Sequence, residues 1–463
     1  MTAAAAPAPA ARIDIARVAM TSLAASSIEW YDFFIYGTAA ALVFPQLFFP
    51  KDMPPFVALI ASFSTVAVGF IARPVGGIVF GHYGDRIGRK RALVLAMMIM
   101  GVGTTCVGLL PGYATLGIAA PLILTLLRFA QGFAVGGQWG GAALLAIENA
   151  PLDRRGFFGS FAQMGVPAGV ILSNLIFIVM GEVMPKEDFA AWGWRIPFLI
   201  SVLLVLLGLY VQLKLEDTVD FQALQALEVE KQTAAAKALA AEKGVSLEQA
   251  RATLRASATS PIFRVIARHP KEILLAAGSF VAANGTFYIM IIYAVAYATK
   301  TLHVPKSTVL WAVIVGSVIS APVLPLTAAL SDRFGRRGVF LAGAALALIW
   351  SWPFFMLLNT GQFPMMALAM IGGLTFNSVM NGLQAAMMTE MFSTEFRYSG
   401  ASLGYQIGAI LGGGLAPILS AALFEKYGSA SAISAYMAAL CAISFLSVLV
   451  LTETHKRELR RTR

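Results

Sequence analysis

The sequence predicts an all-α integral membrane protein with twelve transmembrane helices in two pseudo-symmetric six-helix bundles. Three observations support this fold class: an apolar composition, a series of apolar runs of membrane-spanning length, and an internal repeat. The 463-residue chain is 58% hydrophobic and 13% charged, with a mean hydropathy of +0.75. A soluble chain carries about 25% charged residues. So little charge cannot cover the surface of a soluble protein of this length, which disfavours a large soluble enzyme.

Apolar runs of about 20 residues are long enough to cross a bilayer core of about 30 Å as helices. The first and fourth of these runs are longer than one straight crossing needs, so we expect tilt or extension beyond the lipid there. The expected spans are 17–48, 54–80, 91–111, 117–147, 156–181, 194–213, 272–298, 308–330, 339–358, 363–389, 399–424 and 430–452.

The net charge of +10 is concentrated in alternate loops between these spans, which argues against nucleic acid as a partner. Basic residues cluster around 86–91, 154–155, 333–337 and 456–463, and the intervening loops hold few. This positive-inside pattern predicts a multi-pass protein of a bacterial inner membrane with both termini in the cytoplasm. The N-terminal region shows no cleavable signal peptide, so the first helix is expected to act as an uncleaved insertion signal.

The sequence divides into two halves joined by a polar bridge. We expect a cytoplasmic N-terminus at 1–16, a first bundle at 17–213, a cytoplasmic helical linker at 214–271, a second bundle at 272–452 and a basic cytoplasmic tail at 453–463. The linker is rich in Ala, Glu, Lys, Gln and Arg, which favours water-exposed helix. Within it, Gly244 is typical of a helix end, and Ser246 with Gln249 matches a capping box for the next helix.

The two halves repeat each other in sequence. The stretch 81–91 (GHYGDRIGRKR) follows the second span, and 331–337 (SDRFGRR) follows the eighth. Glu148, Arg155 and Ser160 recur as Glu390, Arg397 and Ser402, each 242 positions later. An internal duplication of six spans is typical of a secondary transporter whose substrate site lies between two similar bundles.

The loop motif at 81–91 resembles the signature of the major facilitator superfamily. Other stretches are similar to its metabolite:proton symporter branch, which holds shikimate, citrate, dicarboxylate and proline/betaine carriers: 28–37 (IEWYDFFIYG), 73–77 (RPVGG), 128–132 (RFAQG), 136–141 (GGQWGG) and 192–198 (WGWRIPF). The resemblance covers the chain except residues 1–12 and the linker. It implies the major facilitator fold and alternating access. Gln138 stands where many members carry Glu, and Ala328 replaces the leading Gly of the second loop motif.

Ionisable groups deep in the predicted spans are few, and such groups usually face a cavity or a partner. They are Glu29, Asp32, Arg73 and Arg128. A proton symporter needs a carboxylate that gains and loses a proton, and we assign Asp32 to this role, with Arg128 as the cation that pairs with it in one state. The superfamily's sugar–proton carriers have a similar Asp and Arg. The alternative is a permanent ion pair that locks two helices. Glu29 either shares the proton or bonds a neighbouring helix.

Arg73 is the candidate for a substrate carboxylate, because the planar guanidinium matches a carboxylate with two parallel hydrogen bonds. The alternative is that Arg73 binds backbone carbonyls near Pro74. Neutral polar side chains in the spans are candidates for further substrate contacts, although each could equally join helices. They are Tyr36, Gln131, Gln138, Gln163, Asn284, Tyr288, Asn377, Asn381 and Tyr405.

The two loop motifs are expected to form a gate. A carboxylate beside a helix N-terminus is stabilised by the helix dipole, and the family resemblance implies that such a contact closes the cytoplasmic side when the cavity faces outward. A membrane-orienting cation patch is compatible with the same residues. The gating candidates are Gly81, Asp85, Arg86, Arg89, Glu148, Arg155, Asp332, Arg333, Glu390 and Arg397.

The sequence contains no phosphate-binding loop of a primary pump, and its four histidines lie far apart, so we expect no metal, no cofactor and no enzyme activity. The predicted function is proton symport that imports a small organic acid, such as shikimate, an aromatic acid or a di- or tricarboxylate. The expected partners are this solute, protons and the lipid bilayer. Import of a zwitterionic osmolyte such as proline or betaine is the alternative, and a non-transporting membrane sensor on a carrier scaffold is a second one.

Overall fold

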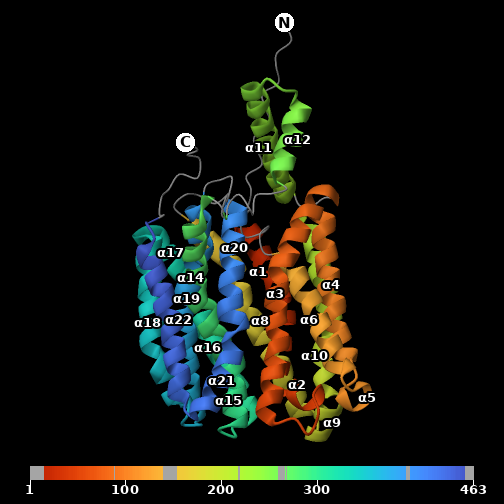
Figure 1. The fold of residues 1–463 in the computed structure, drawn as a ribbon, viewed down its shortest axis with the longest axis vertical. Helices are drawn as coiled ribbons and strands as arrows, with labels where there is room; N and C mark the ends of the chain where they lie inside the picture. Colours follow the sequence, from red (N-terminus) through yellow and green to blue (C-terminus); the bar gives the residue numbers. More distant parts are fainter. Residues whose placement is uncertain are drawn as a thin grey trace.

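A computed structural model describes residues 15–87, 89–138, 154–216, 219–258, 266, 268–392 and 397–453 of the protein. These residues form an elongated bundle of helices, with a helical hairpin projecting beyond one end (Figure 1). We call this end the linker end. The chain enters and leaves the bundle there, and the short helices α2 (Phe44–Leu47), α5 (Tyr113–Leu116) and α9 (Lys186–Ala191) lie at the opposite end.

The first half of the bundle contains six long helices. They are α1 (Ile15–Leu42), α3 (Pro55–Ile87), α4 (Arg89–Leu109), α6 (Ala119–Gln138), α8 (Arg155–Val183) and α10 (Ile196–Glu216), the last preceded by the 3-10 turn η1 (Gly193–Arg195). The second half also crosses six times. Its elements are α14 (Pro270–Tyr288), η2 (Ile289–Tyr293) and α15 (Ala294–Lys300); α16 (Lys306–Ser320) and α17 (Val323–Phe334); α18 (Arg336–Leu358); α19 (Phe363–Met391); α20 (Arg397–Ala409), η3 (Ile410–Gly414) and α21 (Ala416–Tyr427); and α22 (Ala430–Val450).

Nine helical segments among the described residues are long and apolar enough to cross a membrane. Two shorter apolar helices, Val94–Leu109 and Gly193–Leu203, belong to further crossings, and α1 completes the predicted twelve. The expected fold class is therefore confirmed, with differences inside the spans. The first predicted span ends early, because the helix stops at Leu42 and a separate turn of helix, α2, follows. The eighth predicted span is broken before Val323, where Pro322 precedes α17.

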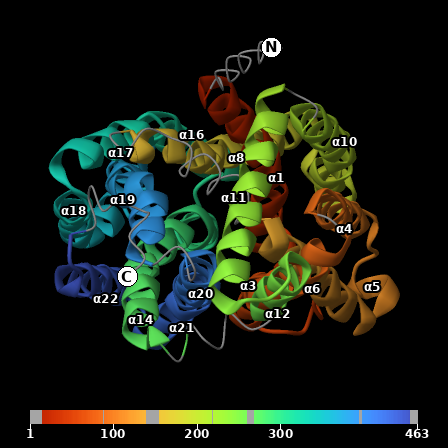
Figure 2. The ribbon, with the colours of Figure 1, turned by 90° about the horizontal axis from the view of Figure 1, so that it is seen from above.

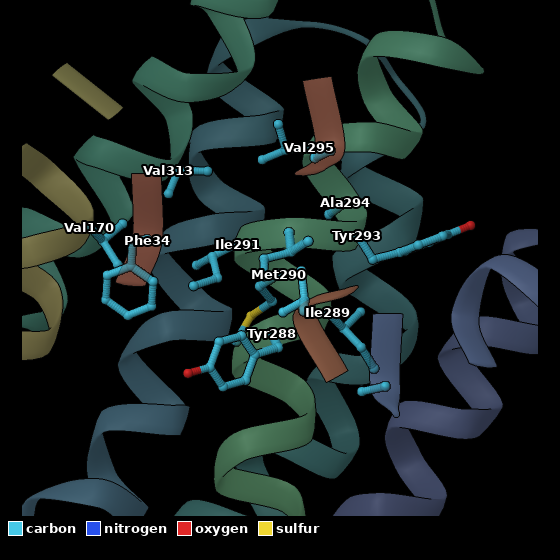
Figure 3. Packing of buried hydrophobic residues seen from close by; sticks show 14 of the residues in the cluster. Phe34, Val170, Tyr288, Ile289, Met290, Ile291, Tyr293, Ala294, Val295 and Val313 are labelled. Carbon is cyan, nitrogen blue, oxygen red and sulfur yellow. The ribbon is translucent and has the colours of Figure 1, made fainter. Parts of the chain in front are cut away.

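Two crossings of the second half contain π-helical segments, η2 in the seventh and η3 in the eleventh. A π segment inserts an extra residue into the helical turn and is frequent at functional sites. Figure 3 shows that η2 belongs to the main buried cluster, where Phe34 and Val170 of the first half are packed together with Ile291 and Val313 of the second. The two halves therefore share one hydrophobic core along their seam.

Viewed from the linker end, α3, α4, α6 and α10 lie on one side and α14, α18, α19 and α22 on the other (Figure 2). The seam is formed by α8 against α16 and α17, and by α3 against η3 and α21. The linker helices α11 (Val219–Lys243) and α12 (Leu247–Ala258) lie above the bundle. Between them, Gly244 has φ of 62°.

The predicted capping box is present at the start of α12. The backbone N–H of Gln249 donates to Ser246 Oγ at 3.2 Å, and the backbone N–H of Ser246 donates to Gln249 Oε1 at 3.1 Å. These two bonds satisfy N–H groups that lack partners within the first turn of a helix.

Glycines on α6 allow this helix to contact α3 backbone to backbone. A Cβ atom on Gly132 would lie 2.0 Å from the carbonyl oxygen of Gly69, and one on Gly136 would lie 1.9 Å from that of Arg73. The spacing of four places both glycines on one helix face, as in small-residue contacts between membrane helices. This close approach brings the α3 residue Arg73 near the α6 residue Arg128.

We expect Gly132→Ala to lower the thermal stability of the purified protein, because the added methyl group forces α3 and α6 apart at a cost of about 1–3 kcal/mol. Gly181→Ala is the matched control, since nothing lies within 4 Å of a Cβ atom at that position. Thermal unfolding in detergent should show a lower Tm for Gly132→Ala than for Gly181→Ala. An equal or higher Tm would contradict the backbone contact.

Candidate functional site

A cavity of about 50 Å³ lies at the seam between the two halves. A buried water needs roughly 10–15 Å³ of such space, so the cavity has room for a few waters or part of a small solute. It combines aromatic walls with neutral polar groups. The aromatic residues are Trp30, Phe280, Phe287, Tyr288 and Tyr405, and the polar ones are Gln163, Asn284, Ser317, Ser320, Asn377, Ser378 and Asn381.

The structure brings six of the predicted substrate contacts to this cavity: Gln163, Asn284, Tyr288, Asn377, Asn381 and Tyr405. Gln163 comes from α8 of the first half, and the other five come from α14, α19 and α20 of the second. The cavity therefore has walls from both halves. A solute within it would contact both bundles, as the internal duplication predicts.

Some of these amides also join helices. Asn377 Nδ2 on α19 donates to the carbonyl of Ala283 at 2.7 Å and to Thr286 Oγ1 at 3.0 Å, both on α14. Asn381 Nδ2 donates to Asn377 Oδ1 at 2.7 Å. The alternative interpretation, helix–helix bonding, is therefore correct for Asn377, which also faces the cavity.

Arg73 does not line the cavity, but it contacts the cavity residue Tyr405 and lies among aromatic rings. Its guanidinium is 4.4 Å from the ring centre of Phe70 and 4.7 Å from that of Phe33. Nη1 donates to the hydroxyl of the cavity residue Tyr405 at 3.4 Å, whereas Nε and Nη2 have no hydrogen-bond partner among the described residues. The backbone-carbonyl interpretation of Arg73 is therefore wrong for this structure. The side chain is only 1% exposed, so its unused N–H groups point into protein.

Arg128 lies over the same aromatic ring, that of Phe33. Its guanidinium is 4.2 Å from the ring centres of Phe33 and Tyr36. Nη1 donates to Gln131 Oε1 at 3.2 Å, while Nε and Nη2 have no partner among the described residues. A cation above an aromatic face is stabilised by the ring quadrupole. Phe33 thus contacts both buried guanidinium groups.

Asp32 is 1% exposed, and neither carboxylate oxygen has a hydrogen-bond partner among the described residues. Its polar neighbours are the hydroxyls of Thr104 on α4 and Ser201 on α10. No ion pair joins Asp32 to Arg128, so the permanent lock between two helices is not present. Pairing in another state of the protein stays a prediction.

Three other candidate site residues lie near the buried charges of Asp32, Arg73 and Arg128 without lining the cavity. Glu29 is one helical turn before Asp32 and interacts electrostatically with Arg73. The Tyr36 hydroxyl donates to Thr65 Oγ1 at 2.7 Å, and Gln131 Nε2 donates to Thr104 Oγ1 at 2.9 Å. The side chain of Gln138 lies outside the described residues.

The second loop motif forms a buried ionic cluster at the linker end. Asp332 accepts hydrogen bonds from the backbone N–H groups of Gly156 at 2.9 Å and Phe157 at 3.0 Å, in the first turn of α8. These bonds connect the second half to the first. They have the geometry expected of a carboxylate stabilised by a helix N-terminus.

Arg336 is the centre of this cluster, although it is not among the gating residues predicted from the sequence. It contacts Asp332 Oδ1 at 2.6 Å and forms two hydrogen bonds with Glu390, at 3.0 and 3.2 Å. The predicted gating residue Arg333 is instead exposed, with its guanidinium 5.4 Å from the ring of Phe334. The distinction depends on the turn between two helices, because Arg333 lies in the last turn of α17 whereas Arg336 begins α18 after Gly335, whose φ is 100°.

Several gating candidates cannot be placed in this cluster. Glu148 lies outside the described residues, as do the side chains of Asp85, Arg86, Arg89, Arg155 and Arg397. The backbone of Gly81 lies within α3.

Three aromatic residues of the cavity wall, Trp30, Phe280 and Phe287, were not predicted from the sequence. Phe280, Asn284 and Phe287 recur at helical spacing on α14, and this pattern is the signal that identifies one cavity-facing side.

Comparison with known proteins gives one consistent result. The sugar (and other) transporter family matches residues 18–462. The inner membrane metabolite transport protein YhjE of Escherichia coli K12 is 37% identical over 449 residues, covering 96% of this chain and 95% of that protein. The shikimate transporter of the same strain is 36% identical, covering 95% of each chain. The proline/betaine transporter of Salmonella typhimurium LT2 is 32% identical, covering 94% of this chain and 83% of that protein.

Solved structures agree on the fold. The proton:xylose symporter XylE bound to 6-bromo-6-deoxy-D-glucose matches with a TM-score of 0.71 at 18% identity, covering 96% of this chain and 97% of that chain. A partially occluded inward-open structure of XylE from E. coli matches with a TM-score of 0.68 at 17% identity, covering 96% and 99%. These proteins are transporters, not enzymes. The chain thus belongs to the sugar (and other) transporter family of the major facilitator superfamily, as its loop motifs predict.

Proposed function

We propose that the protein is a proton-coupled symporter that imports a small organic acid across a bacterial inner membrane by alternating access, with both termini in the cytoplasm. One observation carries the proposal. The buried guanidinium of Arg73 contacts Tyr405 in the wall of the cavity between the halves, and two of its nitrogens have no hydrogen-bond partner among the described residues. Buried donors without partners are costly, and a carboxylate in the cavity would supply the missing acceptors.

The remaining walls favour a planar or cyclic acid. Aromatic rings from both halves would cover the faces of such a solute, while the amides and serines of α8, α14, α16 and α19 offer hydrogen bonds to hydroxyl groups. Polar groups that are few and fixed in position give a mostly apolar pocket its specificity. The similarity to the shikimate transporter supports this class of solute.

Proton coupling is assigned to Asp32. A carboxylate with no hydrogen-bond partner among the described residues can take up a proton without breaking a contact, and its neighbour Ser201 also has an unused hydroxyl. When the cavity changes sides, release of that proton would leave a negative charge for Arg128 to pair with. Glu29, one turn away, interacts with Arg73 and would sense the same solute.

The cluster around Asp332 is proposed as the gate at the cytoplasmic end. Its hydrogen bonds to the start of α8 hold the two halves together there. By internal symmetry, Asp85 would contact the start of α20 in the same way. Both contacts must break for the cavity to open to the cytoplasm.

A zwitterionic osmolyte is the second candidate, and the aromatic walls favour it. A quaternary ammonium group is attracted to aromatic faces, and Trp30, Phe280, Phe287 and Tyr288 all line the cavity. The carboxylate of such a solute would use Arg73 in the same way. The similarity to proline/betaine transporters supports this reading.

Purified protein should be screened by thermal shift against shikimate, benzoate, succinate, citrate, proline and glycine betaine. We expect a cyclic monocarboxylate to give the largest rise in Tm, because one guanidinium and several aromatic walls match one carboxylate on a ring. A largest shift with glycine betaine or proline would establish the zwitterion reading. No shift with any compound that has a carboxylate would contradict both.

Arg73→Ala should raise the KM for uptake of the compound selected by that screen by roughly 10- to 100-fold, since loss of a charged hydrogen-bonded pair costs about 1.5–3 kcal/mol. Arg73→Lys should recover part of the loss, because lysine keeps the charge but not the two parallel donors. Arg251→Ala, on the exposed face of α12, is the control and should leave KM unchanged. An unchanged KM in Arg73→Ala would refute the carboxylate assignment.

Asp32→Asn should abolish uphill accumulation in proteoliposomes under a pH gradient, because asparagine cannot carry a proton between the two sides. Exchange of labelled for unlabelled solute at equal pH should persist. Asp52→Asn, an exposed carboxylate between α2 and α3, is the control and should accumulate solute normally. Accumulation against a gradient by Asp32→Asn would exclude Asp32 as the coupling group. Binding without any proton flux in the wild type would instead indicate a sensor.

A further inference from the structure

A chain of hydrogen bonds connects Arg128 to the neighbourhood of Asp32 through a side chain that proton coupling does not by itself require. Arg128 Nη1 donates to Gln131 Oε1 at 3.2 Å, Gln131 Nε2 donates to Thr104 Oγ1 at 2.9 Å, and Thr104 Oγ1 donates to the carbonyl of Met100 at 2.9 Å. Gln131 is 2% exposed. The chain thus crosses from α6 to α4 inside the protein, and Asp32 lies beside its Thr104 end.

The direction of every bond in this chain is fixed by chemistry. Arginine has only donors, so the amide oxygen of Gln131 must face Arg128 and its NH₂ group must face Thr104. The Thr104 oxygen then accepts from Gln131, and its own hydrogen goes to the Met100 carbonyl. Thr104 has no hydrogen left to donate to Asp32. Its second lone pair can only accept, and a protonated Asp32 would supply a donor.

An ionised Asp32 would instead need donors, and the arginine at the other end of the hydrogen-bond chain has unused ones. Arg128 has Nε and Nη2 without partners among the described residues. No ion pair joins Arg128 to Asp32 in this structure, so the guanidinium would have to move to reach an ionised Asp32, and that movement would break its bond to the Gln131 oxygen. A hydrogen bond to a charged acceptor is roughly twice as strong as one to a neutral acceptor. Arg128 would therefore bind an ionised Asp32 in preference to the Gln131 oxygen.

We propose that Gln131 is a positioning residue for proton coupling, whose amide oxygen holds Arg128 away from Asp32 while Asp32 carries a proton. Loss of the proton lets Arg128 leave Gln131 and pair with Asp32. The inference rests on the proposed role of Asp32. It assigns Gln131 a function outside substrate binding, for which the sequence analysis had selected it, and it agrees with the absence of Gln131 from the cavity wall.

The polar groups that other helices place beside Asp32 are uncharged, so the competition between Gln131 and Asp32 for Arg128 controls the coupling. The helix α4 offers the Thr104 hydroxyl and α10 offers the Ser201 hydroxyl, neither of which is charged. On α8, the backbone carbonyl of Ala162 accepts from Ser26 Oγ and the Asn174 amide oxygen accepts from Thr38 Oγ1, and neither bond involves a charge. The titratable groups that interact with Asp32 are Glu29 and Tyr31 on α1, and the cations Arg73 on α3 and Arg128 on α6 contact the ring of its neighbour Phe33.

Infrared difference spectroscopy of the substrate-free protein tests the inference, because it follows the carbonyl stretch of the protonated acid as pH is varied. The band that disappears in Asp32→Asn reports Asp32. In Gln131→Leu, which keeps the side-chain volume but no acceptor, Arg128 is free to pair with Asp32. The midpoint of the Asp32 band should then move to lower pH by at least about one unit, or about 1.4 kcal/mol.

Two further variants separate positioning from packing. Gln131→Glu retains an acceptor for Arg128, so its midpoint should not fall below that of the wild type. Gln46→Leu, an exposed glutamine on α2, should leave the midpoint unchanged. A shift of less than about 0.3 unit in Gln131→Leu, or about 0.4 kcal/mol, would overturn the role of Gln131 alone. A wild type without any Asp32-dependent band would overturn the assignment of Asp32 and this inference together.

Discussion

Two buried guanidinium groups share the ring of Phe33, and the arrangement of the site depends on this interaction. Arg73 and Arg128 are each 1% exposed, and each leaves two nitrogens without a hydrogen-bond partner among the described residues. Burial of a charge is expensive unless the charge is compensated. The aromatic faces of Phe33, Phe70 and Tyr36 supply part of that compensation. In the proposed transport cycle, a solute carboxylate at Arg73 and an ionised Asp32 at Arg128 supply the remainder.

The backbone contact between α3 and α6 makes this arrangement possible. Gly132 and Gly136 bring the two helices so close that a single added carbon would overlap carbonyl oxygens of α3. Larger residues at these positions would move Arg128 away from Arg73 and from α1. Helices of a membrane bundle gain little from the hydrophobic effect within lipid, so close packing and polar contacts fix their relative positions. The same helix pair therefore determines both stability and the geometry of the charges.

The seam is held by different kinds of interaction at the linker end and nearer its middle. At the linker end, Asp332 contacts the first turn of α8 and Arg336 joins Asp332 to Glu390, so charged hydrogen bonds connect the halves. Nearer the middle of the seam, apolar packing prevails, with Ile292 of η2 against Gly37 of α1. Charged contacts can be exchanged for water when a gate opens, whereas apolar contacts can slide. The π segments η2 and η3 interrupt the regular turns of the seventh and eleventh crossings, and such segments are frequent at functional sites.

Composition and periodicity alone determined the membrane environment, the twelve crossings and the duplication, because apolar length and repeated motifs are local properties of the chain. The loop motifs also identified the family, and the scarcity of charge in the spans singled out Asp32, Arg73 and Arg128. Only the tertiary structure decided which groups meet. It placed Tyr405 beside Arg73, separated Asp32 from Arg128, inserted Gln131 between Arg128 and Thr104, and buried Arg336 in place of Arg333. These outcomes depend on helix rotation and on contacts between segments far apart in sequence, and a hydrophobic pattern defines each helix without fixing either.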